Sequence, residues 1–406
     1  MSYLIFCSFE VGGQPFRMAE TLNRFGVETY YVYVGPKTEG HDTTEFHYGK
    51  ERKAWNLSDL FEYGSRDSKA VVKKLGEIKL RYNIMHCLAT GYGAYLLQQA
   101  GIPYLYWSYG SDLDQQCFML LPFSCTPLWK RLLLHQYRVW RERQKARTSI
   151  RFAGSVMISP YQIEALAKVG PDKKMFFLPH YFKLMDYERL LEEKRKNKKA
   201  LSQEIQEDRF FFSSARHIWS GPLRGMSDRK GNDVILHAYS RYLKLTGDLH
   251  SKLVLVKKGP DVESSRALSK KLRIEENLVW ADEVSRDQLD RYYQGADLCF
   301  GQFGTPVLTY AVLEPLSNAC VGVSQLSHEE QGVPFYREAP PIFNSKQPDE
   351  IAHFMAEILN TPNRYSDLGY QSWQWIKENC SEEKFVNAFI TLFKDEGSPD
   401  SGTSRA

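Results

Sequence analysis

Short apolar runs alternate with stretches of helical periodicity along the first part of the chain. The runs have the length and the Val, Ile, Tyr and Phe content of buried strands, and they cover residues 3–8, 27–34, 82–88, 102–110, 155–160 and 174–180. Helix-spaced apolar positions lie between them, over 17–25, 93–100 and 161–169, and a long helix is predicted from about Thr126. Strands that alternate with helices are typical of βαβ units with a parallel sheet.

The alternation stops in a charge-rich stretch and then restarts. Residues 190–209 read LLEEKRKNKKALSQEIQEDR and carry no core pattern after Leu191, which predicts a solvated linker or a frayed helix. Further strands are predicted over 210–214, 252–256, 278–280, 298–301 and 320–324, with helices that include 264–272 and 286–293. Amphipathic helices over 351–359 and 385–393 precede a polar tail with a disordered composition, 396–406.

The composition is that of an ordinary globular protein and changes this picture little. The 406 residues are 43% apolar and 25% charged, enough for two cores, and the net charge of +4 does not indicate a dedicated nucleic-acid binder. The seven cysteines form no C-x-x-C pair, which favours reduced thiols in a cytoplasmic protein and gives no zinc-ligand spacing. The first residues lack the features of a signal peptide, and no apolar stretch is long enough to span a membrane.

One loop after a predicted strand groups cationic residues in a way that suits an anion. In RHIWSGPLRGMSDRKG, Arg216 comes directly after the apolar run 210–214, and Lys230 with Gly231 comes directly before a predicted helix. A guanidinium and an ammonium group near a helix N-terminus suit a diphosphate. A basic, solvated surface loop explains the same local sequence equally well.

Two further loops could contact the same kind of ligand. Gly12 and Gly13 lie between the first strand and the first helix, where backbone N–H groups can approach an anion, although a structural turn is the alternative. Thr309 is predicted to cap a helix that carries Glu314 in its second turn. The Glu314 carboxylate can accept hydrogen bonds from ribose or sugar hydroxyls, and its apolar neighbours argue against an ordinary surface glutamate.

Two segments of the first half carry other candidate chemistry. In WSYGSDLD, Asp112 and Asp114 spell D-x-D, but no further carboxylate or histidine cluster accompanies them, so Asp112 is predicted to be a hydroxyl partner or general base, not a metal ligand. The segment 126–151 is strongly basic and forms an amphipathic helix that either lies in an anionic membrane interface or packs on the sheet. The cations expected to share one face are Arg131, Arg138, Arg141 and Lys145.

Taken in order, these loops resemble those of GT-B fold glycosyltransferases, and the second half of the chain resembles the retaining GT4 family, glycosyltransferase group 1. The resemblance covers approximately residues 3–393 and is strongest over 210–323. It implies an α/β fold with two Rossmann-like domains whose parallel sheets face each other across a cleft. The implied domains are an acceptor domain over 1–189, a charged linker over 190–209, a donor domain over 210–364, and helices at about 365–395 that cross back to the first domain.

The resemblance also implies roles for single residues of the donor domain. Arg216 and Lys230 match the two basic residues that clamp the donor diphosphate, and Glu314 matches the second of two family glutamates, the one that holds the donor ribose. Pro306 stands where the family has its first glutamate. The sugar contacts of that glutamate are expected to pass to backbone groups near Gly304 and Thr305.

In the first half, the resemblance is carried by two short segments. Gly12 and Gly13 resemble the family's glycine loop near the donor phosphates. SYGSDL resembles a segment in which many members carry His-Gly. Here Tyr109 takes the histidine's place, and Asp112 remains as a polar group.

The implied activity is transfer of a sugar, with retention of anomeric configuration, from a UDP- or GDP-linked donor to a hydroxyl of a carbohydrate, glycolipid or small molecule. The donor is a substrate, so no cofactor, metal or nucleic acid is expected. Polysaccharide biosynthesis is the implied context, with the protein cytoplasmic or bound peripherally to the inner face of a membrane. An inverting transferase, a sugar-nucleotide epimerase or a non-catalytic module of the same fold are the alternatives.

Overall fold

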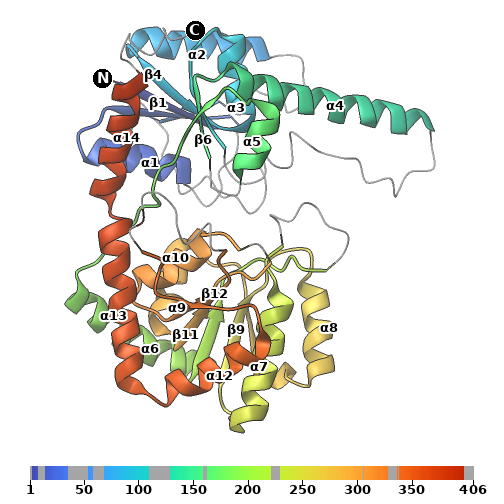
Figure 1. Cartoon of the computed structure of the whole chain (residues 1–406), viewed down its shortest axis with the longest axis vertical. Coiled ribbons are helices and arrows are strands. Elements are labelled where there is room, and N and C mark those ends of the chain that lie inside the picture. The colour runs from blue at the N-terminus through green and yellow to red at the C-terminus, as the bar shows by residue number, and fades with distance from the viewer. Residues whose placement is uncertain are drawn as a thin grey trace. The chain divides into compact units, whose positions relative to one another are not determined.

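The computed structural model divides the chain into two compact units, which are drawn together in Figure 1. Unit 1 comprises Met1–Leu178 and Val386–Ala406, and unit 2 comprises Pro179–Phe385. The structure describes residues 2–7, 14–34, 54–57, 68–108, 129–158, 162–220, 229–304, 306–327, 336 and 338–396.

Unit 1 is built on a parallel sheet with the strand order β3-β2-β1-β4-β5-β6-β7 among its described residues. The strands are β1 (Tyr3–Cys7), β2 (Thr29–Tyr33), β3 (Ala54–Asn56), β4 (His86–Ala89), β5 (Leu105–Trp107), β6 (Ser155–Met157) and β7 (Lys174–Phe176). The helices are α1 (Gln14–Arg24), α2 (Ser68–Arg81), α3 (Gly91–Gln99), α4 (Trp129–Phe152) and α5 (Ile163–Val169). Strand and helix alternate as the sequence predicts.

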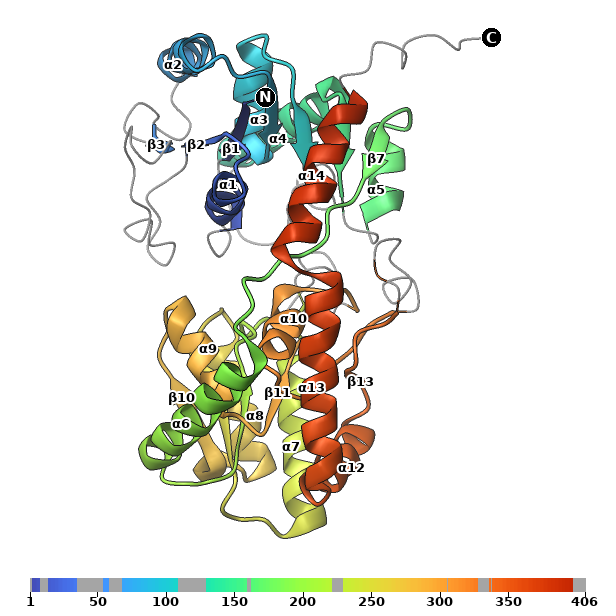
Figure 2. The same cartoon turned by 90° about the vertical axis from the view of Figure 1, so that its left-hand side faces the viewer.

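The side chains of a strand alternate between the two faces of the sheet, so the apolar strand β1 packs against other elements on both faces. Leu4 and Phe6 of β1 point into a core that also contains Val71 of α2 and Leu97 of α3. On the other face the ring of Tyr3 packs against Phe389 of α14 (Glu382–Glu396), with 5.2 Å between the ring centroids. Figure 2 shows α14 alongside the strands of unit 1.

Unit 2 is built on a second parallel sheet, with the order β10-β9-β8-β11-β12-β13 among its described residues. Its strands are β8 (Phe210–Ser213), β9 (Lys252–Val256), β10 (Leu278–Ala281), β11 (Leu298–Phe300), β12 (Gly322–Ser324) and β13 (Phe343–Asn344). Its helices are α6 (Tyr187–Ile205), α7 (Asn232–Thr246), α8 (Val262–Leu272), α9 (Arg286–Gly295), α10 (Tyr310–Ser317), α12 (Pro348–Leu359) and α13 (Pro362–Asn379), and α14 begins in this unit.

The triple phenylalanine of β8 explains why the second sheet has a helix layer on each face. Phe211 packs into a core with α7 and α12, whereas Phe210 and Phe212 pack into a core on the opposite face with α6 and α9. A strand buried on both faces is expected to be continuously apolar, as FFF is. Figure 1 shows α7 and α8 on one side of these strands and α9 and α10 on the other.

The charge-rich stretch 190–209, for which the sequence suggests a linker or a frayed helix, differs from that expectation. Most of it belongs to α6, whose Asp186 side chain accepts hydrogen bonds from two N–H groups of the first turn, those of Glu188 and Arg189. Leu190 and Leu201 are fully buried. They lie eleven positions apart, which is about three helical turns, so both lie on the same face of α6. This face packs against the rest of unit 2.

The units divide between Leu178 and Pro179, and α6 lies within unit 2. The predicted division at 190–209 therefore lies downstream of the observed one. None of the helices in the described part of the chain combines the length and the apolar character that a membrane span requires.

Candidate functional site

The order of strands in unit 2 marks one edge of its sheet as the place for a ligand. β8 is adjacent to β9 on one side and to β11 on the other. The chain leaves β8 through α7 to reach β9, and leaves β11 through α10 to reach β12, and these two helices lie on opposite faces. In open parallel sheets, ligands bind beyond the carboxyl ends of the strands at such a reversal of strand order. A ligand of unit 2 is therefore expected at the loops after β8 and β11.

The structure brings the predicted cation Lys230 onto the loop that follows β11. The Lys230 N–H donates to the carbonyl of Ile218 (2.8 Å), and the Lys230 carbonyl accepts from the N–H of Phe303 (2.9 Å). The Lys230 ammonium donates to Oε1 of Gln302 (3.1 Å). Both loops of the strand reversal thus meet at this lysine, directly before α7.

Two glycines allow these backbones to approach closely. Gly231 has φ +67°, and a Cβ built on it would lie 2.8 Å from Cβ of Phe303 and 2.9 Å from the backbone nitrogen of Gly304. A Cβ on Gly304 would lie 2.5 Å from Cβ of Arg229. A side chain at either position would therefore push the N-terminus of α7 away from the loop after β11.

Arg216 lies beyond the carboxyl end of β8 and is exposed. It forms no ion pair with the other residues that the structure describes. A guanidinium that is exposed at the strand reversal and has no carboxylate partner there can bind an anionic ligand.

Glu314 is buried in α10, as its apolar neighbours predict, and is only 6% exposed. Its Oε2 accepts a hydrogen bond from the hydroxyl of Tyr293 in α9 (2.9 Å). The same hydroxyl lies 2.7 Å from the hydroxyl of Ser214, which follows β8 directly. Sequence reasoning missed Tyr293 and Ser214, because nothing in a local pattern indicates a contact between residues 79 positions apart.

The residues between Phe303 and Glu314 agree only partly with expectation. Thr309 occupies the N-cap position of α10, but its side chain makes no capping hydrogen bond, and its buried Oγ1 has no hydrogen-bond partner among the residues that the structure describes. The Pro306 carbonyl accepts from the N–H of Ser327 (2.9 Å), which ties this loop to the segment after β12.

A set of polar side chains holds the segment that follows Arg216. His217 is fully buried, its Nδ1 lies 2.8 Å from Oγ of Ser265, and burial lowers the pKa of its imidazole to about 4. The Asp261 carboxylate accepts from the N–H groups of Trp219 (2.6 Å) and Ser220 (2.8 Å). Burial raises the pKa of Asp261, but these bonds and the one from the Ser220 hydroxyl outweigh it, so the pKa is lowered overall.

Several predicted residues lie outside the described residues. These are Gly12, Gly13, Tyr109, Asp112, Asp114 and Thr305, together with residues 221–228 of the cationic loop.

The basic helix of the first half begins at Trp129 as α4, close to the predicted start. The ammonium of Lys145 lies 4.9 Å from the ring centroid of Tyr92 and 5.3 Å from that of Tyr95, both in α3. Trp140 and Arg141 are exposed. Lys145 therefore packs against α3 and is partly buried, whereas Arg141, four positions before it, is exposed.

Comparison with known proteins identifies the fold. No family model and no curated protein matches the sequence. Sucrose-phosphate synthase from Thermosynechococcus elongatus matches at 13% identity and TM-score 0.64, covering 98% of this chain and 99% of that one. Anabaena HepE in complex with UDP and glucose matches at 11% identity and TM-score 0.66, and the match covers 97% of this chain and 100% of that one. WaaG, a glycosyltransferase involved in lipopolysaccharide biosynthesis, matches at 10% identity and TM-score 0.58, and the match covers 98% of this chain and 100% of that one.

The chain therefore has the GT-B fold of glycosyltransferases, an α/β fold of two Rossmann-like units. The expectation of fold class drawn from the sequence is confirmed. At identities of 10–13% the match defines the fold, and the activity has to be argued from the residues of the site.

Proposed function

We propose that this protein is a glycosyltransferase that moves a sugar from a nucleoside-diphosphate sugar to a hydroxyl acceptor with retention of anomeric configuration. The observation that supports this most directly is the meeting of Lys230 with Gln302 and Phe303 at the N-terminus of α7. It gathers an ammonium group and a helix N-terminus at the strand reversal, with Arg216 exposed at the same edge. This arrangement suits the diphosphate of a donor. UDP bound to HepE, a protein of the same fold, agrees with this assignment.

The chemistry proposed for Arg216 and Lys230 is stabilisation of the leaving group. As the bond between the sugar and the β-phosphate breaks, negative charge grows on the phosphate oxygen. A guanidinium and an ammonium beside the N-terminal dipole of α7 lower the energy of that charge. The backbone N–H groups of Gly12 and Gly13 are proposed to bind the diphosphate as well. These residues supply the stabilisation with no metal ion in the proposed mechanism.

Glu314 is proposed to bind the ribose of the donor. A carboxylate repels phosphate but accepts hydrogen bonds from the two ribose hydroxyls. With Pro306 at the position of a second carboxylate, the sugar contacts are assigned to backbone groups near Gly304 and Thr305, with Thr309 beside them. The Oγ1 of Thr309, which has no partner within the described part of the chain, supports a polar ligand at the start of α10.

The acceptor is proposed to bind unit 1, with Asp112 as the polar group that meets its hydroxyl. A carbohydrate or glycolipid acceptor fits a protein that works at a membrane surface. The exposed Trp140 and Arg141 of α4 support contact with an anionic membrane, because an aromatic and a cationic side chain together favour the lipid interface.

Binding and product analysis test the proposal. UDP, GDP and ADP are each added separately to the wild type. At least one of them should raise its melting temperature. Arg216→Ala and Lys230→Ala should each lower the affinity for that nucleotide by roughly 100-fold, the effect of removing a charged hydrogen-bond donor from a phosphate. Arg209→Ala, which removes a cation from the opposite edge of the same sheet, is the matched control.

The outcomes separate the candidate functions. A wild type that binds none of the three diphosphates would contradict the donor assignment. If a nucleotide binds, NMR of the product's anomeric carbon distinguishes a retaining from an inverting transferase. Epimerisation of the free sugar nucleotide would indicate an epimerase. A protein that binds the nucleotide but neither transfers nor slowly hydrolyses the sugar would be a non-catalytic module.

A further inference from the structure

We infer that Tyr293 is a positioning residue that fixes the Glu314 carboxylate for the donor ribose, and that Ser214 fixes Tyr293 in turn. The inference rests on the proposed function, since it concerns how one part of that site is held. Its starting point is the chain of hydrogen bonds from the end of β8, through α9, to α10.

The direction of these hydrogen bonds follows from the groups involved. A carboxylate only accepts, so the single phenolic proton of Tyr293 is donated to Oε2 of Glu314. The phenolic oxygen is then free to accept, and the Ser214 hydroxyl at 2.7 Å is its donor. The chain therefore has one order of donation, from Ser214 to Tyr293 to Glu314.

Burial makes this arrangement rigid. Tyr293 is 1% exposed, and its ring packs edge-on against Phe212 of β8, with 5.4 Å between centroids. Burial, followed by the negative charge of Glu314, raises the pKa of Tyr293 well above its usual value, so its hydroxyl keeps its proton. The carboxylate is thus held at one oxygen by a donor that cannot rotate away.

The chain also links the two halves of the proposed donor site. Ser214 lies two residues before Arg216, which is assigned to the diphosphate, whereas Glu314 is assigned to the ribose. A displacement of β8 relative to α10 would break one of the two hydrogen bonds. The distance between the diphosphate-binding and ribose-binding groups is therefore set by Tyr293, which a purely apolar residue of the same core could not do.

The α10 helix is held independently at its other end, which isolates the role of the tyrosine. Lys194 donates to the carbonyls of Asn318 (3.2 Å) and Ala319 (3.0 Å), just beyond the last turn. Asn318 donates to Oδ1 of Asp290 in α9 (3.0 Å) and accepts from Gln294 (2.9 Å). Removing the Tyr293 hydroxyl should therefore leave α10 in place and remove the donor that holds Oε2 of Glu314.

The experiment compares ribose recognition in the full-length wild type, Tyr293→Phe and Tyr239→Phe. Tyr239 is a matched control: it is fully buried in the same unit, and its hydroxyl donates to the carbonyl of Ser251 (2.7 Å), outside the proposed site. The probes are the nucleoside diphosphate that binds the wild type and its 2′-deoxy and 3′-deoxy forms, measured by calorimetric titration. The readout is the ratio of affinities for the ribose and deoxyribose forms.

We expect the wild type to prefer the ribose form by roughly tenfold or more, the effect of hydrogen bonds to a charged acceptor. Tyr293→Phe should bring this ratio close to one while the deoxy forms bind nearly as before, because the phosphate contacts remain. Tyr239→Phe should keep the wild-type ratio. Loss of stability alone would weaken all nucleotides together and would not change the ratio.

Other outcomes overturn the inference in distinguishable ways. A Tyr293→Phe protein with the wild-type ratio shows that Tyr293 does not position Glu314, while the proposed function stands. A wild type that binds the ribose and deoxyribose forms equally removes the ribose assignment itself, and one that binds no diphosphate removes the proposed function. If Tyr293→Phe does not fold, Ser214→Ala takes its place, with about a threefold fall in the ratio expected and no fall overturning the inference.

Discussion

The two edges of the sheet in unit 2 use the same pair of groups for different purposes. At the carboxyl edge, the hydroxyl of Tyr293 donates to Glu314 (2.9 Å). At the amino edge, the hydroxyl of Tyr242 donates to Asp248 (2.7 Å). Both tyrosines are buried, and both carboxylates lie close to loops that carry an arginine. What differs is whether the arginine of each edge forms an ion pair with the residues that the structure describes.

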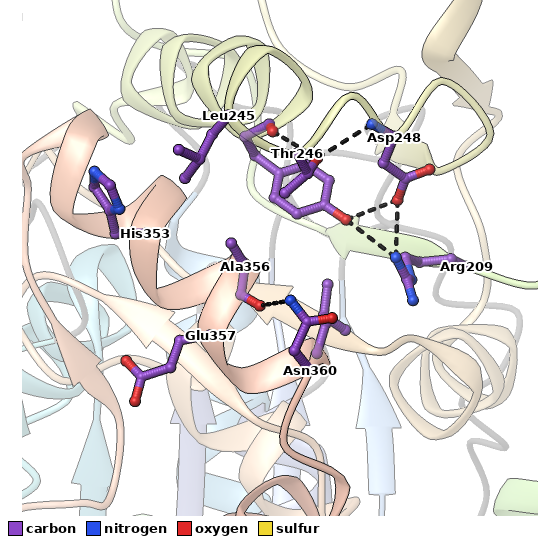
Figure 3. Close-up of a pocket in the computed structure, with 10 residues that line it drawn as sticks. Arg209, Leu245, Thr246, Asp248, His353, Ala356, Glu357 and Asn360 are labelled. Atoms are coloured by element: carbon purple, nitrogen blue, oxygen red, sulfur yellow. Dashed lines mark hydrogen bonds and ion pairs between the residues drawn. The ribbon is translucent and has the colours of Figure 1, made fainter.

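At the amino edge, the charged groups form hydrogen bonds and an ion pair with one another. Asp248 accepts from Arg209 (3.0 Å), from Tyr242, and from the N–H groups of His250 (3.2 Å) and Ser251 (3.1 Å). Burial raises the pKa of Asp248, but these bonds outweigh it and lower the pKa overall. Figure 3 shows Arg209 and Asp248 of this cluster among the residues that line a groove. The volume of the groove is about 550 Å³. The groove is lined by Arg209, Tyr242, Leu245, Thr246, Asp248, His353, Ala356, Glu357, Leu359 and Asn360.

The carboxyl edge, by contrast, presents Arg216 without an ion-pair partner among the described residues. A paired cation offers little to an anionic ligand, since its charge is already compensated. A groove beside a satisfied ion pair is thus weaker evidence for a binding site than an exposed cation at a strand reversal. The pairing of charges therefore indicates the candidate site better than the groove does.

The largest difference between the edges should appear in the two glycines that flank α7. Gly231 and Gly247 have nearly the same φ, +67° and +69°, but a Cβ would overlap Phe303 and Gly304 at the first and meet nothing within 4 Å at the second. Gly247→Ala should cost about 1 kcal/mol of unfolding free energy, from the left-handed backbone alone. Gly231→Ala should cost at least about 2 kcal/mol more, because backbone atoms must move.

Urea unfolding followed by circular dichroism measures both values. Gly231→Ala should also remove nucleotide binding, while Gly247→Ala should keep it. Equal losses of stability in the two variants would show that the contact between the loops after β8 and β11 is not close, and the site would lose its main support.

The fold of both units could be predicted from the sequence far better than the candidate site could. FFF at 210–212 and the alternation around it predict a buried central strand from local pattern alone. β3 and β13 were missed because runs of three and two residues carry no periodicity. α2 was missed as well, although it is fourteen residues long.

The site depends on distances between segments, which local patterns do not record. Arg216, Lys230 and Glu314 could be named because each lies next to a strand end or a helix start, and because a family motif connects them. Tyr293 looks like any aromatic residue on a helix, and its role follows from a hydroxyl that reaches Glu314, 21 positions along the chain. Hydrogen bonds of this kind have to be seen in the structure.

The second prediction concerns pH and the histidine beside Arg216. Burial lowers the pKa of His217 to about 4 in the folded protein, against about 6.5 in the unfolded chain. The unfolded chain therefore takes up the proton first, so stability is fully present above pH 6.5 and is lost as the pH falls towards 4. Between pH 7 and pH 5 this residue should account for a loss of about 2 kcal/mol.

Urea titrations at pH 7 and pH 5 should show that His217→Gln loses less unfolding free energy than the wild type does. His353→Gln, a change at an exposed position of the amino edge, should keep the wild-type loss. Burial of its imidazole lowers the pKa of the partly exposed residue His180 to about 4 as well, and this supplies a second part of the dependence that both variants retain. An unchanged loss in His217→Gln would mean that this imidazole is hydrated in the folded state.

The third prediction tests the purely structural role of the amino-edge tyrosine. Tyr242→Phe should lower the unfolding free energy by about 1–2 kcal/mol, because a carboxylate loses a buried hydroxyl donor. Nucleotide affinity and the preference for ribose should stay at the wild-type values, in contrast to Tyr293→Phe. Thermal unfolding with and without the nucleotide measures both quantities. A change in ribose preference would show that the two edges are coupled.

The smallest effect is expected from the arginine that the groove displays. Arg209 is 44% exposed, and its ion pair with Asp248 is therefore screened by water and salt. Arg209→Ala should cost less than about 1 kcal/mol, and raising the salt concentration should shrink that cost further. Nucleotide binding should be unchanged, whereas Arg216→Ala should lose the nucleotide with little change in stability. If Arg209→Ala instead weakened the nucleotide more than Arg216→Ala did, the groove at the amino edge would be the binding site, and the pairing of charges would be the wrong guide to it.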